Sequence, residues 1–154
     1  MTLRRRSILT FFIAFVLCLS MSVEKSTAQQ AHKIILAGYN HSPSVPTSGS
    51  GMATVSFEND TLKVKGDFKN LVGAFRGAYI MVGEKGKPGN MLFRLEVEVN
   101  EERTGGVIKP KNNAFTLNDA QKPLLKDGEL FINITSYEHP SGELRGQIPG
   151  MNID

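Results

Sequence analysis

Residues 124–148 read LLKDGELFINITSYEHPSGELRGQI and carry the clearest strand–turn–strand pattern in the chain. Residues 129–136 are rich in Phe, Ile and Thr, side chains that favour a pleated, half-buried strand. Pro140 and Gly142 then supply residues typical of a tight turn, and residues 143–148 return as a second strand. The pattern predicts a β-hairpin that closes the domain.

The rest of the chain repeats this short-strand pattern. Further strands are predicted at residues 33–37, 51–57, 62–68, 75–82, 91–99 and 114–117, with a short edge strand around 106–109. The segments between them are rich in Gly, Pro, Asn and Ser, which favour turns. About eight short strands predict an all-β fold, an antiparallel Greek-key β-sandwich that is immunoglobulin-like or superoxide-dismutase-like.

Two of these strands have a well-defined register. From Leu62 to Phe68 every second side chain is apolar or Gly, and the positions between them carry charge. Residues 91–99 alternate over a longer run, so the sequence predicts one continuous strand. The positions expected to point inward are Met91, Phe93, Leu95, Val97 and Val99. A shift by one residue would bury three charges, so the pattern fixes this register.

One helical turn is predicted within residues 118–128. Asn118 and Gln121 have the spacing of a capping box, in which each side chain binds the other residue's backbone N–H. Gly128 suits the position after the helix end, and Pro123 limits the helix to one or two turns.

The N-terminal segment has the organisation of a signal peptide. Three arginines at positions 4–6 precede an apolar run at residues 8–23, which is shorter than the roughly 20 residues needed to span a bilayer. The small residues Ser26 and Ala28 predict cleavage before Gln29. We therefore expect a signal peptide at residues 1–28 and no membrane span in the mature chain.

The mature chain at residues 29–154 is then a single domain that is secreted, periplasmic or associated with the cell envelope. An uncleaved anchor and a twin-arginine signal are the alternatives, but the strongly apolar segment favours the general secretory pathway. A lipoprotein signal at Cys18 is excluded because Leu17, which precedes it, is not small. Cys18 is the only cysteine, so the mature domain has no thiol for a disulfide, a metal or catalysis.

The charge of the mature domain argues against nucleic acid as a partner. The whole chain has 18 Lys and Arg against 15 Asp and Glu. Four of these basic residues and one acidic residue precede Gln29, so the mature domain keeps fourteen of each sign. A formally neutral domain has no global attraction for nucleic acid or for an anionic membrane.

The closing hairpin resembles the CHRD domain, a module first described as repeats in chordin and also found in bacterial exported proteins. The family pattern is a strand of the form dG.lYvNvHT, a Pro-Gly turn and a strand of the form GEIRGQ. The corresponding residues here are DGELFINIT at 127–135 and GELRGQI at 142–148. Residues 45–55, VPTSGSGMATV, resemble the opening of the family pattern, so the resemblance covers about residues 32–149.

The chain departs from the family pattern at three histidine positions. Many CHRD domains carry aHIHg in the central strand, where this chain has Tyr79 and Met81 in place of the histidines. The histidine of NvHT is replaced by Thr135. A phenol and a thioether are poor ligands for zinc, so a metal site that used those imidazoles in relatives is not carried over. We expect no metal site and no cofactor.

The candidate binding residues are Glu143 and Arg145, which lie two positions apart and share one face of the last strand. They would form a polar patch for a carbohydrate or a peptide. The alternative, which we favour, is structural: an ion pair, with Arg145 bonding across strands to a carboxylate or to loop carbonyls and fixing the hairpin register. The histidines, His32, His41 and His139, lack a local ligand motif, and no catalytic residue stands out.

The resemblance implies an exported, non-enzymatic module that binds an extracytoplasmic protein or glycan. The alternative is a metal- or redox-linked β-sandwich analogous to copper–zinc superoxide dismutase, which rests on architecture alone. A structural role within a larger envelope assembly is a third possibility. The sequence names no partner among these.

Overall fold

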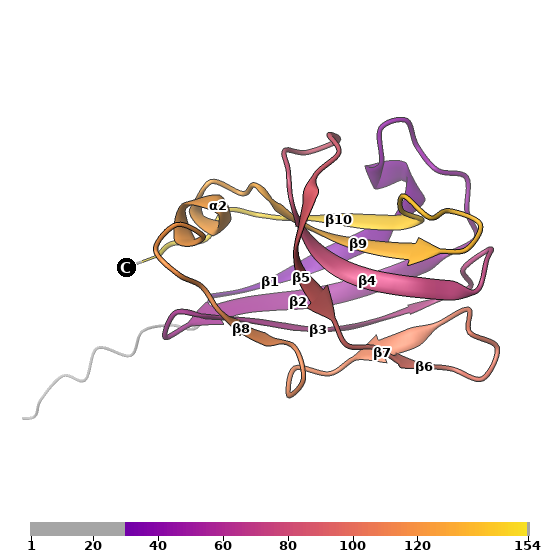
Figure 1. Ribbon diagram of the computed structural model, residues 1–154, viewed down its shortest axis with the longest axis horizontal. Helices are drawn as coiled ribbons and strands as arrows, with labels where there is room; N and C mark the ends of the chain where they lie inside the picture. The colour runs from indigo at the N-terminus through magenta and orange to yellow at the C-terminus, as the bar shows by residue number, and fades with distance from the viewer. Residues whose placement is uncertain (1–29, 154) are drawn as a thin grey trace, which may run out of the picture.

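The protein folds as an all-β domain in a computed structural model that describes residues 30–153 (Figure 1). The predicted fold class is confirmed: ten antiparallel strands form one curled sheet. The strands are β1 (Gln30–Ala37), β2 (Ser50–Glu58), β3 (Thr61–Lys69), β4 (Phe75–Val82), β5 (Asn90–Leu95), β6 (Glu98–Val99), β7 (Gly106–Ile108), β8 (Ala114–Thr116), β9 (Leu130–Ser136) and β10 (Leu144–Ile148). The predicted signal peptide lies outside the described residues.

The closing hairpin lies in the middle of the sheet. The strand order is β5-β4-β9-β10-β1-β2-β3-β7-β6, with β8 beside β3. Because β9 pairs with β4 and β10 pairs with β1, the last two strands join an early hairpin to a middle one. The sheet curls so that β4 and β9 face β3, β7 and β8 across the interior (Figure 1).

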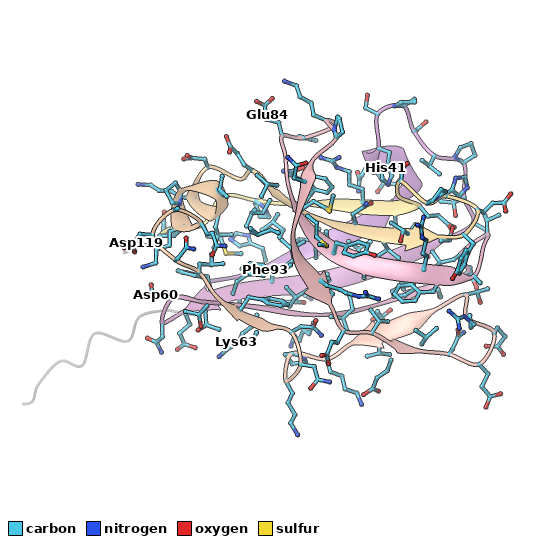
Figure 2. The ribbon with its side chains drawn as sticks, viewed as in Figure 1. His41, Asp60, Lys63, Glu84, Phe93 and Asp119 are labelled. Atoms are coloured by element: carbon cyan, nitrogen blue, oxygen red, sulfur yellow. The ribbon has the colours of Figure 1, made fainter. Side chains whose placement is uncertain are left out.

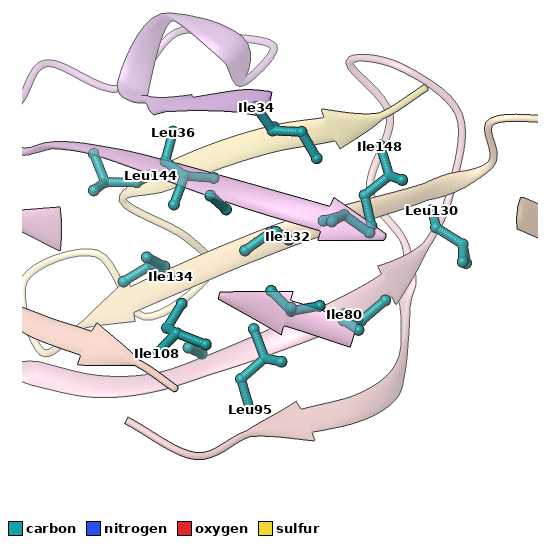
Figure 3. Close-up of a cluster of buried hydrophobic side chains, with 14 of the residues drawn as sticks. Ile34, Leu36, Ile80, Leu95, Ile108, Leu130, Ile132, Ile134, Leu144 and Ile148 are labelled. Atoms are coloured by element: carbon teal, nitrogen blue, oxygen red, sulfur yellow. The ribbon is translucent and has the colours of Figure 1, made fainter. Parts of the chain in front are cut away.

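The core lies inside this curl and is built from aliphatic side chains. Ile80, Ile132, Ile134, Leu144 and Ile148 are fully buried there (Figure 3). The predicted alternation in β3 is confirmed, since its apolar positions are buried and its lysines are half-buried or exposed. All seven residues of β9 are buried, so this strand is covered on its outer face as well.

The predicted strand at residues 91–99 is wrong in its length and at its ends. A β-bulge shifts the pairing of β5 with β4 at Ile80 and Met81, so Met91 leaves the predicted register and is 62% exposed. After Leu95 the chain leaves β4, and Val99 pairs with β7 instead, where it is 36% exposed. The sequence alternation could not show this change of partner strand.

The buried side chain of Asn113 takes the place of a partner strand at the break. Its Oδ1 accepts from the Glu96 N–H at 2.8 Å, and its Nδ2 donates to the carbonyls of Glu96 and Lys109, both at 2.9 Å. Beside it Phe93 stacks on Phe115 of β8 at 4.6 Å between ring centroids, which joins the sheet across its curl (Figure 2).

The two hydrogen bonds predicted between Asn118 and Gln121 form, but they close the turn before the helix, and Gln121, the N-cap residue of the helix, has no side-chain cap. The Gln121 N–H donates to Asn118 Oδ1 at 3.0 Å and the Asn118 N–H donates to Gln121 Oε1 at 3.1 Å, before α2 (Lys122–Lys126). Gly128 follows the helix with φ +73°, a conformation that favours glycine. A short 3₁₀ turn, η2 (Gly38–Asn40), follows β1. In residues 30–153 no helix has the length and apolarity to cross a membrane.

Replacing Asn113 with Ala should lower the free energy of unfolding by about 1–3 kcal/mol, because backbone groups at the strand break lose their partners. Chemical denaturation measures the change. The neighbouring Asn112 is exposed, and Asn112→Ala should change stability by less than about 0.5 kcal/mol. Equal effects of the two substitutions would contradict the role given to Asn113.

Candidate functional site

The candidate site lies on the outer face of the closing hairpin. Arg145 on β10 is paired with Asn133 on β9, and Asn133 is paired with Tyr79 on β4, so these three positions form a row across the sheet. Asn133 and Arg145 are each only 4% exposed because loops cover them. A strand face that carries polar side chains is therefore buried here, which is unusual and requires partners for each group.

Arg145 holds the turn between β4 and β5. Its Nη1 donates to the Lys87 carbonyl at 2.6 Å, and its Nη2 donates to the Glu84 carbonyl at 2.8 Å. The guanidinium carbon also lies 3.5 Å from the centroid of the Phe131 ring. Burial lowers the pKa of the Arg145 guanidinium from its ordinary value, yet arginine stays charged in proteins. Arg145 was expected to bond either to a carboxylate or to loop carbonyls, and the loop carbonyls are its observed partners.

Glu143 holds a different set of loops. Its Oε1 accepts from the Thr47 hydroxyl at 2.5 Å and from the Val72 N–H at 2.7 Å. The side chain is fully buried, and within residues 30–153 no ion pair joins it to Arg145, so that expected alternative is not observed. Glu143 Oε2 is buried as well.

The ionisation of Glu143 follows from these contacts. Burial raises the pKa of the carboxyl, but the Ser136 hydroxyl, the Thr47 hydroxyl and the Val72 N–H lower it further than burial raises it. The net result is a pKa below the ordinary value of 4.5, so Glu143 is a carboxylate at neutral pH.

Gln147 completes the row on β10. Its Nε2 donates to the carbonyls of Gly128 at 2.8 Å and Gly83 at 3.1 Å, and its Oε1 accepts from Arg145 at 3.3 Å. The three outward side chains of GELRGQI thus each bind the main chain of surrounding loops. Through these contacts the closing hairpin holds the surrounding loops in place.

A cavity of about 460 Å³ opens beside this row. Residues 41–43 and Val45 from the β1–β2 connection line one side, and residues 86–89 from the β4–β5 turn line another. Its floor includes Met81, Phe131 and Asn133. Figure 2 shows His41 beside β9 and β10, with Glu84 on the turn above β4. The hairpin and the two loops that it holds therefore enclose one hollow.

His41 and Asn133 line this cavity, and each has a buried polar atom without a hydrogen bond. Asn133 Nδ2 donates to the Ser141 carbonyl at 3.0 Å, but Oδ1 is buried with no hydrogen bond. His41 Nε2 is likewise buried with no hydrogen bond. Burial, followed by the nearby charges of Arg145 and His139, lowers the pKa of His41 below 6.5, so the imidazole is neutral at pH 7.

A larger hollow of about 550 Å³ lies on the other side of the β1–β2 connection, beside Tyr39. It is lined by apolar, hydroxyl and main-chain groups and contains no charged or imidazole side chain. The cavity beside Arg145 is smaller, but it has the polar chemistry that a specific site requires.

The model of the CHRD domain family matches residues 32–148. The chain belongs to the CHRD family. Searches of curated proteins and of solved structures gave no match. The match covers every strand of the sheet except the start of β1, so the geometry above is that of a CHRD domain.

The three positions where this CHRD domain lacks the family histidines gather on the same face. Tyr79 and Met81 lie two apart on β4, and Met81 lines the cavity. Thr135 on β9 donates from Oγ1 to the Gly77 carbonyl at 3.0 Å, so it is engaged in the sheet. Among residues 30–153 no group of three or more His, Cys, Asp or Glu side chains is placed to hold a metal.

The sequence patterns did not single out His41 and Asn133 as residues that line one cavity. His41 was an isolated histidine in a Pro- and Ser-rich loop, and only the fold brings it to β9 and to the neighbourhood of His139. Asn133 was visible as a lone amide within an apolar strand, and it is part of a glycosylation sequon. Because its amide is buried and bonded to Ser141, a glycan at Asn133 is incompatible with this fold.

Replacing Arg145 with Ala should lower the free energy of unfolding by about 2–4 kcal/mol, because two loop carbonyls and the face of Phe131 lose their partner. Thermal and chemical denaturation measure the loss. Arg76, which is exposed on β4, supplies the control, and Arg76→Ala should change stability by less than about 0.5 kcal/mol. If Arg145→Ala is as stable as wild type, Arg145 does not hold the turn between β4 and β5 as described.

Stability should also depend on the ionisation of Glu143. Because its pKa is lowered by folding, its contribution to stability is fully present above the ordinary value of 4.5 and is lost as pH falls through the lower folded-state value. Glu143→Gln should therefore cost most stability near pH 7, with the difference from wild type shrinking below about pH 4. Denaturation across this pH range measures it. The exposed Glu101→Gln should follow wild type, and a pH-independent difference for Glu143→Gln would refute the linkage.

Proposed function

We propose that this CHRD protein is an exported binding module that performs no catalysis. It acts outside the cytoplasm, in the periplasm, at the cell envelope or in the medium, and its partner is an extracytoplasmic protein or glycan. The signal-like organisation of residues 1–28 supports export. The neutral charge of the mature domain argues against nucleic acid or an anionic membrane as its target.

The main support for this proposal is that Glu143 and Arg145 of the closing hairpin are already bound to groups within the protein. Glu143 and Arg145 are both buried and both engaged with loop groups, so neither is free to move a proton on a substrate. What they do instead is hold loops around a cavity. A rigid sheet that presents loops is a common way to build a binding surface.

The competing function is a metal- or redox-linked domain analogous to copper–zinc superoxide dismutase. The two functions differ in what the mature protein must contain, since a metal-dependent domain purifies with tightly held, stoichiometric metal. Tyr79, Met81 and Thr135 replace imidazoles by side chains that are poor zinc ligands, which supports the binding module.

Expression of the full chain should yield a mature protein that begins at Gln29 and fractionates outside the cytoplasm, because residues 1–28 are removed on export. Intact mass and cell fractionation measure this, and a chain lacking residues 2–28 is the control that should remain inside. Elemental analysis of the same mature protein should find no stoichiometric zinc or copper. Retention of the full chain in the cytoplasm would overturn export, and one bound metal per chain would overturn the binding-module reading.

A further inference from the structure

The outer face of β1, β2, β3 and β7 carries exposed apolar side chains in one row. Strand pairing places Ile35 opposite Met52, Met52 opposite Asp67, and Asp67 opposite Val107. Ile35, Met52 and Val107 are 59%, 48% and 45% exposed. A single exposed apolar residue is ordinary, but three in one row of four neighbouring strands form a patch, and such patches mark interaction surfaces.

We propose that this row is the centre of a docking surface for a partner protein that presents an extended acidic segment, with apolar side chains between its carboxylates. This inference deepens the proposed binding function and rests on it. It selects a protein over a glycan as the partner. It also assigns the contact to a face of the sheet that shares no lining residue with the cavity beside Arg145.

Lysines border the row on both sides. Lys33 and Lys65 lie in the next row, where each is opposite Thr54, and Lys69 lies in the row on the other side. All three lysines are exposed. Within residues 30–153 none of them forms an ion pair, and neither does Asp67. These charges are therefore available to a partner.

The other charges on these strands cancel within the protein. Lys63 Nζ lies 3.8 Å from Glu58 Oε2, and Lys109 Nζ lies 2.6 Å from Glu98 Oε2. Three unpaired lysines and the single unpaired Asp67 leave the face with a net charge of +2. Because the mature domain as a whole is neutral, this excess is local. It attracts an acidic partner and repels a second copy of the same face.

Two hollows lie along the row and suit an extended partner. The hollow of about 550 Å³ beside Tyr39 includes Ile35 in its lining, and another of about 340 Å³ is lined in part by Met52, Asp67 and Val107. Because Ile35 and Met52 are cross-strand partners, the two hollows are neighbours on one surface. At about 4.8 Å per strand the row is about 14 Å wide, the length of about four residues of extended chain.

The side chains of the row favour a protein over a glycan. The row carries aliphatic and thioether groups and no aromatic ring. A sugar hydroxyl placed against Ile35, Met52 or Val107 would lose its hydrogen bonds to water and gain none. Apolar side chains of a peptide bury the same surface favourably, and Met is enriched in protein interfaces. Asp67, between Met52 and Val107, can accept a hydrogen bond from the main chain of the segment.

The probe is a synthetic peptide of about seven residues that alternates glutamate with leucine and is long enough to cross the row. It is titrated at millimolar concentration into the mature protein, isotope-labelled at its methionine methyl groups, and followed by NMR. The Met52 methyl should shift saturably. The Met91 methyl, which is also exposed but lies on β5, should not. No saturable shift at Met52, or equal shifts at the two methionines, would overturn the proposal.

Two control peptides separate charge from apolar contact. Lysine in place of glutamate keeps the leucines and should abolish binding, because the face is positive. Serine in place of leucine keeps the charge and should weaken binding about tenfold or more, because the row is no longer buried. Equal binding of the lysine peptide would refute an acidic partner, and equal binding of the serine peptide would refute the role of the apolar row.

Substitutions on the protein test the same surface. Met52→Gln and Lys65→Glu should each raise the Kd of the glutamate–leucine peptide about fivefold or more, measured by fluorescence anisotropy of a labelled peptide. Met91→Gln and Lys85→Glu make the same changes at exposed positions outside the face and should leave the Kd within about twofold. All four side chains lie at the surface, so the core is unchanged. Equal effects of the two pairs would sink the assignment to this face.

Other occupants of the face give different results. Oligosaccharides of hyaluronate, an acidic glycan, and vesicles of phosphatidylglycerol should each bind more weakly than the glutamate–leucine peptide, and tighter binding of either would overturn the protein partner. Sedimentation of the protein alone should find a monomer, and a dimer that Met52→Gln dissociates would assign the face to a second copy. Failure of the peptide in an exported, metal-free protein rejects this inference alone, whereas cytoplasmic retention or stoichiometric metal rejects the proposed function.

Discussion

The structure depends on the insertion of one hairpin between two others. β9 and β10 are the last strands in the chain, yet they occupy the centre of the sheet, where β9 pairs with β4 and β10 pairs with β1. Without them the strand order would separate into β4–β5 and β1–β2–β3 with its short neighbours. The sheet is therefore complete only when β9 and β10 are in place between the two other groups of strands. Every residue of β9 is buried as a result.

The alternation of a β-strand lets this hairpin do two tasks at once. On β10, Leu144, Gly146 and Ile148 face the apolar core, where Gly146 allows the close approach of Ile34 and Leu36. The outward positions carry a carboxylate, a guanidinium and an amide, each bound to loop groups far away in sequence. Buried charges are costly without partners, and here the partners are backbone and uncharged side-chain groups, not each other. Each charge thereby fixes a separate set of loops.

The sequence predicted the features that short-range chemistry determines. The closing hairpin, the alternation of β3 and the reciprocal hydrogen bonds of Asn118 and Gln121 all depend on residues a few positions apart, and all three are observed. The break after Leu95 was missed because it depends on Asn113, seventeen positions away from Glu96. The sequence predicted that Arg145 would bond to a carboxylate or to loop carbonyls. Only the fold shows that the carbonyls belong to the turn between β4 and β5.

The cavity shows why the family signature does not specify a ligand. In GELRGQI, Gly142 lets His41 and Asn133 pack closely against the main chain, and both charged side chains are already bound to loop groups. Other walls of the cavity come from β9 and from the loop that begins with the turn after β1. That loop is tied to the framework by Asn40, whose Nδ2 donates to the Arg145 carbonyl at 2.8 Å. The hairpin therefore holds the loop that places His41 at the wall of the cavity, so the wall depends on a contact outside the family signature itself.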